Sequence, residues 1–265
     1  MRRSRAIVVF AAMCCSVLAA LAVSLPAVAG SKQDELEKKL PEKFRKSPYS
    51  LMSLTVGHPN DGFQLRAKRL KSSRYVRVRN SSRAYGHPAL ILMLKRTAKQ
   101  IGRSAHGSRL LVGDISAKNG GFLTGHASHQ SGRDADVAFY QLDAKGKPID
   151  AKSMVAFDGN GKAKDGSGVQ FDDYRNWLLV KSWVDDNRAG LSHVFVSTPL
   201  RKRLLDFARN DRRFKSYVNK AAVLLKQPAN SSAHDDHFHV RISCPKRQEE
   251  ICKEQSKRRA DGDEG

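Results

Sequence analysis

Residues 125–136 read GHASHQSGRDAD and residues 234–241 read HDDHFHVR, and these two stretches hold five of the nine histidines in the chain. Neutral imidazole is the commonest metal ligand in proteins. Residues two apart on a strand point to the same side, so His237 and His239 would face one pocket and Asp134 would align with Asp136. The two stretches therefore predict strands that carry a metal site.

The ligand count of such a site can be met from these residues. A catalytic zinc ion takes three protein ligands and keeps one open position, and His129, Asp136 and His239 could supply the three. The sequence contains no H-E-x-x-H motif, which excludes the class of zinc peptidases whose two histidine ligands lie on one helix. Taken singly, each residue has an ordinary alternative: a lone histidine is more often a surface or hydrogen-bonded residue, and the aspartates could pair with Arg133. Two clusters of the same metal-binding types together favour the metal site.

The sequence around these stretches predicts a mixture of helices and strands. The apolar spacing predicts strands over 109–115, 135–142, 194–197 and 237–244, and helices over 88–103, 174–184, 199–209 and 211–225. Residues 143–172 are rich in Gly, Lys and Asp and predict a long exposed loop. Because strands and helices do not alternate strictly, we expect the α+β class.

The N-terminus predicts export. Arg2, Arg3 and Arg5 precede an uncharged apolar run over 6–23, and Ala27-Val28-Ala29 is typical of a signal-peptidase site. The expected signal peptide is residues 1–29 and the expected location is the periplasm. An uncleaved membrane anchor is the alternative, since the run is nearly long enough to span a bilayer. In an oxidising compartment Cys244 and Cys252 predict a disulfide, with two free thiols as the alternative.

The chain is strongly basic, with 48 Lys and Arg against 26 Asp and Glu and a net charge of +22. Such a surplus favours weak, salt-sensitive association with polyanions. Aromatic residues make up only 7%, and neither an aromatic-studded basic strand nor a zinc-finger spacing is present, so nucleic acid is not an expected partner. The expected partner of this positive charge is instead a membrane surface or an acidic cell wall, contacted peripherally through electrostatic attraction.

The spacing of the two clusters resembles that of a known superfamily. His129-x6-Asp136 with the later His237-x-His239 is similar to lysostaphin-type peptidases, D-Ala-D-Ala metallopeptidases and the hedgehog signalling domain. The closer resemblance is to the penicillin-insensitive murein endopeptidase family. It rests on residues 112–114 (VGD), 85–88 (YGHP), 125–136, the strand at 195–196, and 237–241 followed by Cys244-Pro245. The resemblance spans roughly residues 85–252 and is weak before residue 60, over 143–172 and in the charged tail, while residues 228–232 depart from the pattern.

The resemblance implies roles for individual residues. His129, Asp136 and His239 correspond to the ligands of one Zn²⁺ ion per chain, and His237 to an unliganded histidine that handles the proton of the attacking water. His126 and His234 correspond to outer histidines that line the site and stabilise charge. The implied fold is a small antiparallel sheet flanked by helices, with the zinc site on the sheet. With the charged composition of the two ends of the chain, the expected domain layout is a charged leader over 30–60, a zinc peptidase domain over 61–245 and a charged C-terminal tail over 246–265.

The implied activity is hydrolysis of D-alanyl–meso-diaminopimelate cross-links, with peptidoglycan as the partner. A D,D-carboxypeptidase of the same superfamily is an alternative that the motifs separate poorly from an endopeptidase. A non-catalytic, zinc-containing wall-binding module is the second alternative; replacement of His237 or His126 would favour it, and both are present. The motifs do not distinguish D,D from L,D bonds, and they do not address the oligomeric state.

Overall fold

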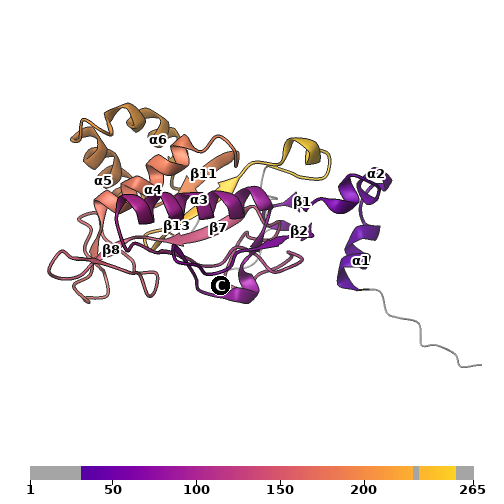
Figure 1. The fold of residues 1–265 in the computed structure, drawn as a ribbon, viewed down its shortest axis with the longest axis horizontal. Helices are drawn as coiled ribbons and strands as arrows, with labels where there is room; N and C mark the ends of the chain where they lie inside the picture. The colour runs from indigo at the N-terminus through magenta and orange to yellow at the C-terminus, as the bar shows by residue number, and fades with distance from the viewer. Residues whose placement is uncertain (1–30, 229–232, 255–265) are drawn as a thin grey trace, which may run out of the picture.

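The computed structural model describes residues 31–228 and 233–254 (Figure 1). The expected signal peptide, residues 1–29, lies outside the described residues. Within the described part of the chain, none of the helices combines the length and the apolar character that crossing a membrane requires.

A six-stranded sheet in the order β12-β11-β13-β7-β6-β4 forms the centre of the molecule. Its strands are β4 (Val76–Val78), β6 (Leu110–Val112), β7 (Asp134–Ala138), β11 (Leu191–Phe195), β12 (Leu225–Lys226) and β13 (His237–Ile242). The four middle strands pair antiparallel, while β4–β6 and β11–β12 are parallel. The fold is therefore mixed, as expected, but the expected small antiparallel sheet is only the centre of a larger mixed one.

The two parallel edges follow from the helices that connect the strands. The chain passes from β4 to β6 through α3 (Pro88–Ser104), and from β11 to β12 through α5 (Thr198–Arg209) and α6 (Val218–Leu224). A helical crossover returns the chain in the same direction, which produces a parallel pair. Both edge strands are too short to give a periodic signal in the sequence.

The helices form close to where the sequence predicts them. At the start of α3, His87 caps the helix by accepting a hydrogen bond from the Ala89 backbone N–H at 3.3 Å, and Pro88 occupies the first turn. The next helix, α4, spans Asp173–Asp185. The helix expected over 211–225 is shortened to α6, preceded by a 3₁₀ turn at Lys215–Tyr217. Asp211 accepts a hydrogen bond from the Arg213 backbone N–H, a local turn that competes with a helix.

Strand alternation separates an apolar face of the sheet from a polar one. Phe238 and Val240 of β13 are fully buried in the main core, and the Phe238 ring meets that of Trp183 on α4 at 5.3 Å. Figure 1 shows α3 and α4 lying across β7 and β13. Because side chains alternate along a strand, His237 and His239 point to the other face.

The region expected to be one long exposed loop, residues 143–172, contains buried structure. Strands β9 (Pro148–Ile149) and β10 (Gln170–Phe171) both pair with β8 (Gln141–Leu142). Phe157 and Phe171 are buried against Phe139, with ring centroids 6.2 and 5.0 Å away. Isolated aromatics between Gly- and Asp-rich turns carry no periodicity, which explains why the sequence did not predict their packing.

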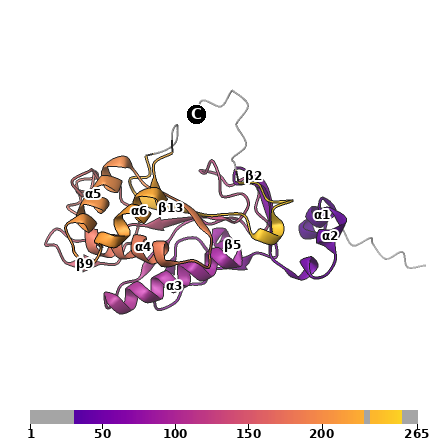
Figure 2. The same cartoon turned by 90° about the horizontal axis from the view of Figure 1, so that it is seen from above.

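A second, smaller core joins segments from the two ends of the described chain. The hairpin of β1 (Leu54–His58) and β2 (Asp61–Leu65) follows α1 (Lys32–Lys38) and α2 (Glu42–Arg45). Its core comprises Leu40, Phe44, Leu54, Leu65 and Ile251. Figure 2 shows β2 beside the yellow segment near the C-terminus. The remaining strands, β3 (Lys68–Arg69) and β5 (Tyr85–Gly86), pair with each other.

The C-terminal segment, residues 245–254, is fastened to that hairpin. The expected disulfide between Cys244 and Cys252 is present. The side chain of Gln248 accepts a hydrogen bond from the Thr55 backbone N–H at 2.8 Å and donates one to the Ser53 carbonyl oxygen at 2.8 Å. The Gly57 backbone N–H donates to the Ile251 carbonyl oxygen at 2.7 Å. These contacts hold the first part of the expected charged tail, while its residues 255–265 lie outside the described residues.

Candidate metal centre

The six residues predicted for the site lie together on the polar face of the sheet. Asp136 lies on β7, His237 and His239 lie on β13, and His126, His129 and His234 lie on the loops that enter these strands. The rings of His126 and His129 are 4.3 Å apart, and those of His129 and His239 are 4.7 Å apart. The ring of His234 lies 5.4 Å from that of His237. The register pairs His239 with Asp136, which brings both sequence clusters to one place.

The loop that carries His126 and His129 is closed at its base. The Gly121 backbone N–H donates to the carbonyl oxygens of Gln130 at 3.0 Å and Gly62 at 3.1 Å, and the Gln130 N–H donates to the Pro59 carbonyl at 3.0 Å. At Gly120, where φ is +70°, an added Cβ would lie 2.1 Å from the Gln130 oxygen, so only glycine fits. His129 itself adopts φ +68°, a strained conformation for a non-glycine residue of the kind found at functional sites.

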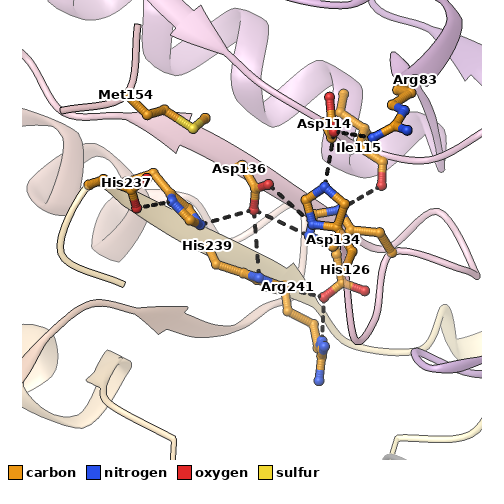
Figure 3. A network of polar contacts seen from close by, with 12 residues as sticks. Arg83, Asp114, Ile115, His126, Asp134, Asp136, Met154, His237, His239 and Arg241 are labelled. Carbon is orange, nitrogen blue, oxygen red and sulfur yellow. Dashed lines mark hydrogen bonds and ion pairs between the residues drawn. The ribbon is translucent and has the colours of Figure 1, made fainter. Parts of the chain in front are cut away.

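Three imidazole nitrogens surround one oxygen of Asp136. From Oδ1, the distances are 3.2 Å to His129 Nε2, 3.3 Å to His237 Nε2 and 3.6 Å to His239 Nδ1 (Figure 3). Ligand bonds of 2.0–2.1 Å in a tetrahedral zinc site place the ligand atoms about 3.3 Å apart. The distances from Asp136 Oδ1 to His129 Nε2 and His239 Nδ1 are close to this spacing.

Two of these atoms lack hydrogen bonds although they are buried. His129 Nε2 and Asp136 Oδ1 are inaccessible to solvent and have no hydrogen-bond partner among the described residues. Leaving a buried polar atom unsatisfied costs about 1–3 kcal/mol, so such pairs are rare without a bound ion or water. The residues present thus fit a metal ion.

Neighbouring groups fix which nitrogen each histidine turns toward the centre. His129 Nδ1 donates to the Ile115 carbonyl oxygen at 2.8 Å, which directs its Nε2 inward. His239 Nε2 donates to Asp134 Oδ1 at 2.8 Å, which leaves Nδ1 facing Asp136. Support of a ligating histidine through its second nitrogen is a general feature of metal sites.

We call Arg241, Asp134 and His239 the inner cluster. Arg241 Nε donates to the same Asp134 oxygen at 2.5 Å, so one carboxylate oxygen accepts from both the guanidinium and the imidazole. The side chains of Asp134, His239 and Arg241 are 0%, 9% and 10% exposed. Burial raises the pKa of Asp134, but Arg241 and His239 outweigh it and hold that pKa below its usual range. Burial lowers the pKa of His239 to about 4, which keeps this imidazole neutral.

We call Arg79, Arg83, Asp114 and His126 the outer cluster. His126 Nε2 and Arg83 Nη1 both donate to Asp114 Oδ2 at 2.9 Å, and Arg79 Nη2 lies 3.3 Å from Oδ1. His126 Nδ1 is 3.7 Å from Asp136 Oδ2, so this ring links the outer cluster to the centre. Burial raises the pKa of Asp114, but the hydrogen bonds from His126 and Arg83 outweigh it and hold the pKa below its usual range.

His237 belongs to neither cluster. Its Nδ1 contacts Asp236 Oδ1 at 2.5 Å while its Nε2 faces Asp136. Burial lowers the pKa of His237, but the contacts with Asp136 and Asp236 outweigh it and raise the pKa to about 10. His234 has φ +50°, and its carbonyl oxygen accepts a hydrogen bond from the Ser197 N–H at 2.9 Å. The separate roles of ligand, base and charge stabiliser remain predictions.

The sequence did not reveal the groups that support the histidines. Asp114 appears there only as part of a motif, although an aspartate that ends the apolar run 110–112 is a usable signal of a functional strand end. Arg241 lies in the quoted stretch but has no role in the prediction, and Asp134, which could have paired with Arg133, instead pairs with Arg241 and His239. Nothing in the sequence marks Arg79 or Arg83.

The chain is similar to named proteins over about two thirds or more of its length. A family profile described as penicillin-insensitive murein endopeptidase matches residues 55–265. A penicillin-insensitive murein endopeptidase of Haemophilus influenzae is 34% identical over 199 residues, which cover 72% of this chain and 63% of that protein. A protein of the same name from Yersinia pestis is 32% identical over 187 residues, covering 66% of this chain and 60% of the relative. The alignments thus span less than two thirds of the length of these relatives.

Proposed function

Because the chain belongs to the penicillin-insensitive murein endopeptidase family, we propose that it is a zinc peptidase that hydrolyses peptide cross-links of bacterial peptidoglycan. The proposed bond is the D-alanyl–meso-diaminopimelate amide. The proposed ligands of one zinc ion are His129, Asp136 and His239.

The observation that carries the proposal is the buried, unsatisfied pair of His129 Nε2 and Asp136 Oδ1 beside His239 Nδ1. Two imidazoles and one carboxylate leave one position of a tetrahedral site open, as hydrolysis requires. A structural site would instead be closed by a fourth protein ligand.

The chain's own groups account for the remaining chemistry. Zinc bound here would supply a Lewis acid that activates water and polarises a carbonyl. His237 Nε2 faces the same oxygen of Asp136 as the proposed ligands, and the charge of Asp136 contributes to its raised pKa. The neutral imidazole is favoured once a zinc ion bound by Asp136 offsets that charge, and it would then take the proton of the attacking water and deliver it to the leaving amine. Asp236 holds its other nitrogen and fixes the ring. His126 and His234 flank the centre, and in this proposal they stabilise negative charge on the substrate oxygen.

The sequence outside the site supports an extracytoplasmic location. The expected signal peptide would direct the protein to the periplasm, where the Cys244–Cys252 disulfide is stable. The positive excess would hold the protein near the acidic wall, an attraction whose range falls from about 10 Å at 0.1 M salt to about 3 Å at 1 M.

Digestion of purified sacculi tests the function. The protein is incubated with sacculi in three states: as purified, after chelator treatment, and after Zn²⁺ is restored to the chelated protein. Mass analysis of the released muropeptides should show cross-linked dimers converted to monomers in the first and third states only. Release of single D-alanine with dimers left intact would identify a carboxypeptidase. Unchanged muropeptides alongside retained binding to sacculi would identify a non-catalytic wall-binding module.

A further inference from the structure

The outer cluster holds more positive charge than its carboxylate neutralises. Arg83 is firmly placed, because its Nη1 donates to Asp114 Oδ2 at 2.9 Å and to the Thr124 carbonyl oxygen at 3.2 Å. Arg79 is held more loosely: its Nη2 lies 3.3 Å from Asp114 Oδ1, an oxygen that accepts no hydrogen bond from the part of the chain that the structure describes. The side chains of Arg79 and Arg83 are 44% and 31% exposed, whereas that of Asp114 is 2% exposed. One guanidinium charge therefore remains available to a ligand from solvent.

These arginines border the candidate metal centre. The single imidazole of His126 contacts both Asp114 and Asp136, so one ring separates the arginine pair from a proposed ligand. Arg79 Nη1 lies 3.7 Å from Met154 Sδ. Met154 covers Gly113, where an added Cβ would lie 2.4 Å from Met154 Cε and 3.3 Å from Asp136 Cβ. Figure 3 shows Asp136 between Met154 and Arg83, with Met154 to its left and Arg83 to its right.

We infer that Arg79, supported by Arg83, binds the substrate carboxylate that lies next to the scissile amide. The inference rests on the proposed function and names what that site recognises. In a D-alanyl–diaminopimelate cross-link, the carbon that bears the scissile amide nitrogen also carries a free carboxylate. With the scissile carbonyl at the metal centre, this carboxylate lies only a few atoms away, on the leaving-group side. A guanidinium fork matches a carboxylate in charge and geometry.

A purely structural role does not account for both arginines. Arg83 and His126 already satisfy Asp114 Oδ2, and Asp114 needs only one guanidinium to balance its charge. Arg79 is solvent-accessible and adds a second charge where no further carboxylate of the cluster lies. The matched control is Arg77 on β4, an exposed arginine two residues away with the same charge.

The test compares two cross-linked peptides that differ only at this carboxylate, which is free in one and amidated in the other. The wild-type protein should cleave the free form with a higher kcat/KM. Arg79→Gln should lower kcat/KM for the free form roughly 10- to 100-fold, the loss expected for a charge-assisted hydrogen bond, mainly through KM. It should leave the amidated form nearly unchanged, and Arg77→Gln should change neither. An equal fall for both peptides, or no fall, would overturn the assignment.

A second readout does not depend on turnover. Both peptides are titrated into metal-free wild-type protein and into the Arg79→Gln variant, with binding followed by calorimetry. The free form should bind the wild type more tightly than the amidated form, and the variant should lose this preference. If the wild-type protein cleaves neither peptide but still prefers the free carboxylate, the proposed function fails and the subsite stands. Equal binding of both forms to the wild type would refute the subsite.

Discussion

The inner and outer clusters use the same three residue types and differ in their access to water. In each, an aspartate accepts from an arginine and from a histidine on the same oxygen. The arginine of the inner cluster is 10% exposed, while those of the outer cluster are 31% and 44% exposed. Salt bridges sealed from solvent are costly to break, whereas exposed ones contribute little to stability. The inner cluster is therefore suited to holding a metal ligand and the outer cluster to meeting a substrate.

The largest expected effect comes from removing the histidine of the inner cluster. His239→Ala reduces the proposed ligands from three to two, so we expect loss of both zinc and activity with the fold retained. Metal analysis of the purified variant checks this. His193→Ala is the control, because His193 lies on the neighbouring strand, stacks on Phe195 at 5.4 Å and is not a proposed ligand. Full zinc content in His239→Ala would remove this residue from the ligand set.

Replacing the two aspartates compares the clusters directly. Asp134→Asn leaves the buried guanidinium of Arg241 without a carboxylate, so the free energy of unfolding should fall by about 3–5 kcal/mol, and zinc affinity about 10- to 100-fold. Asp114→Asn should lower the free energy of unfolding by only about 1–2 kcal/mol, because its arginines can turn to water. Urea unfolding of both metal-free variants measures the difference. Equal losses of unfolding free energy in the two variants would show that the buried inner cluster and the solvent-accessible outer cluster do not differ in their contribution to stability.

His237 tests chemistry that belongs to neither cluster. His237→Ala should keep the zinc ion, because the three proposed ligands remain, and should lower turnover about 100-fold or more, as expected for a lost general base. Stopped assays on a soluble cross-linked dimer, with zinc content measured in parallel, check both parts. Near-normal turnover in a zinc-loaded variant would assign the proton transfer to another group.

Asp186 pairs with an arginine but with no histidine, so it shows how much an arginine–aspartate pair alone contributes to stability, for comparison with the two clusters. Its Oδ2 accepts from Arg96 at 2.5 and 2.9 Å, and Oδ1 accepts from the Ala189 backbone N–H at 2.9 Å. Burial raises the pKa of Asp186, but these hydrogen bonds outweigh it and lower the pKa. The pKa of Asp186 is therefore lower in the folded protein than in the unfolded chain, where it is about 3.9. The charged carboxylate stabilises the folded protein at pH values above about 3.9. This contribution is lost as the pH falls through the folded-state pKa.

Asp186→Asn should therefore lower the free energy of unfolding by about 1–2 kcal/mol at pH 7. The difference from wild type should narrow as the pH is lowered from 4 toward 2, since both proteins are then uncharged at this position. Urea unfolding at a series of pH values measures it. A difference that does not change with pH would show that the carboxylate charge is not the cause.

The sequence predicted the histidines and Asp136 of the site better than the residues that hold them in place. Alternation along a strand is a short-range property, so the common face of His237 and His239 followed from the sequence, as did the helices with regular apolar spacing. The pairing of Asp134 with Arg241 spans 107 residues, and that of Arg83 with Asp114 spans 31. Such contacts depend on strand order and register, which no local pattern specifies. The edge strands β4 and β12 were missed for a related reason, because two or three residues have no measurable period.

Residues 245–254, which hold the β1–β2 hairpin in place, are synthesised long after the hairpin itself. The contact between Thr55 and Gln248 spans 193 residues, and closing a loop of that length is entropically costly and slows folding. The hairpin that this segment holds also closes the base of the loop that carries His126 and His129. A nascent chain that has reached residue 244 therefore already contains all six predicted site residues, but not the last segment that secures their loop.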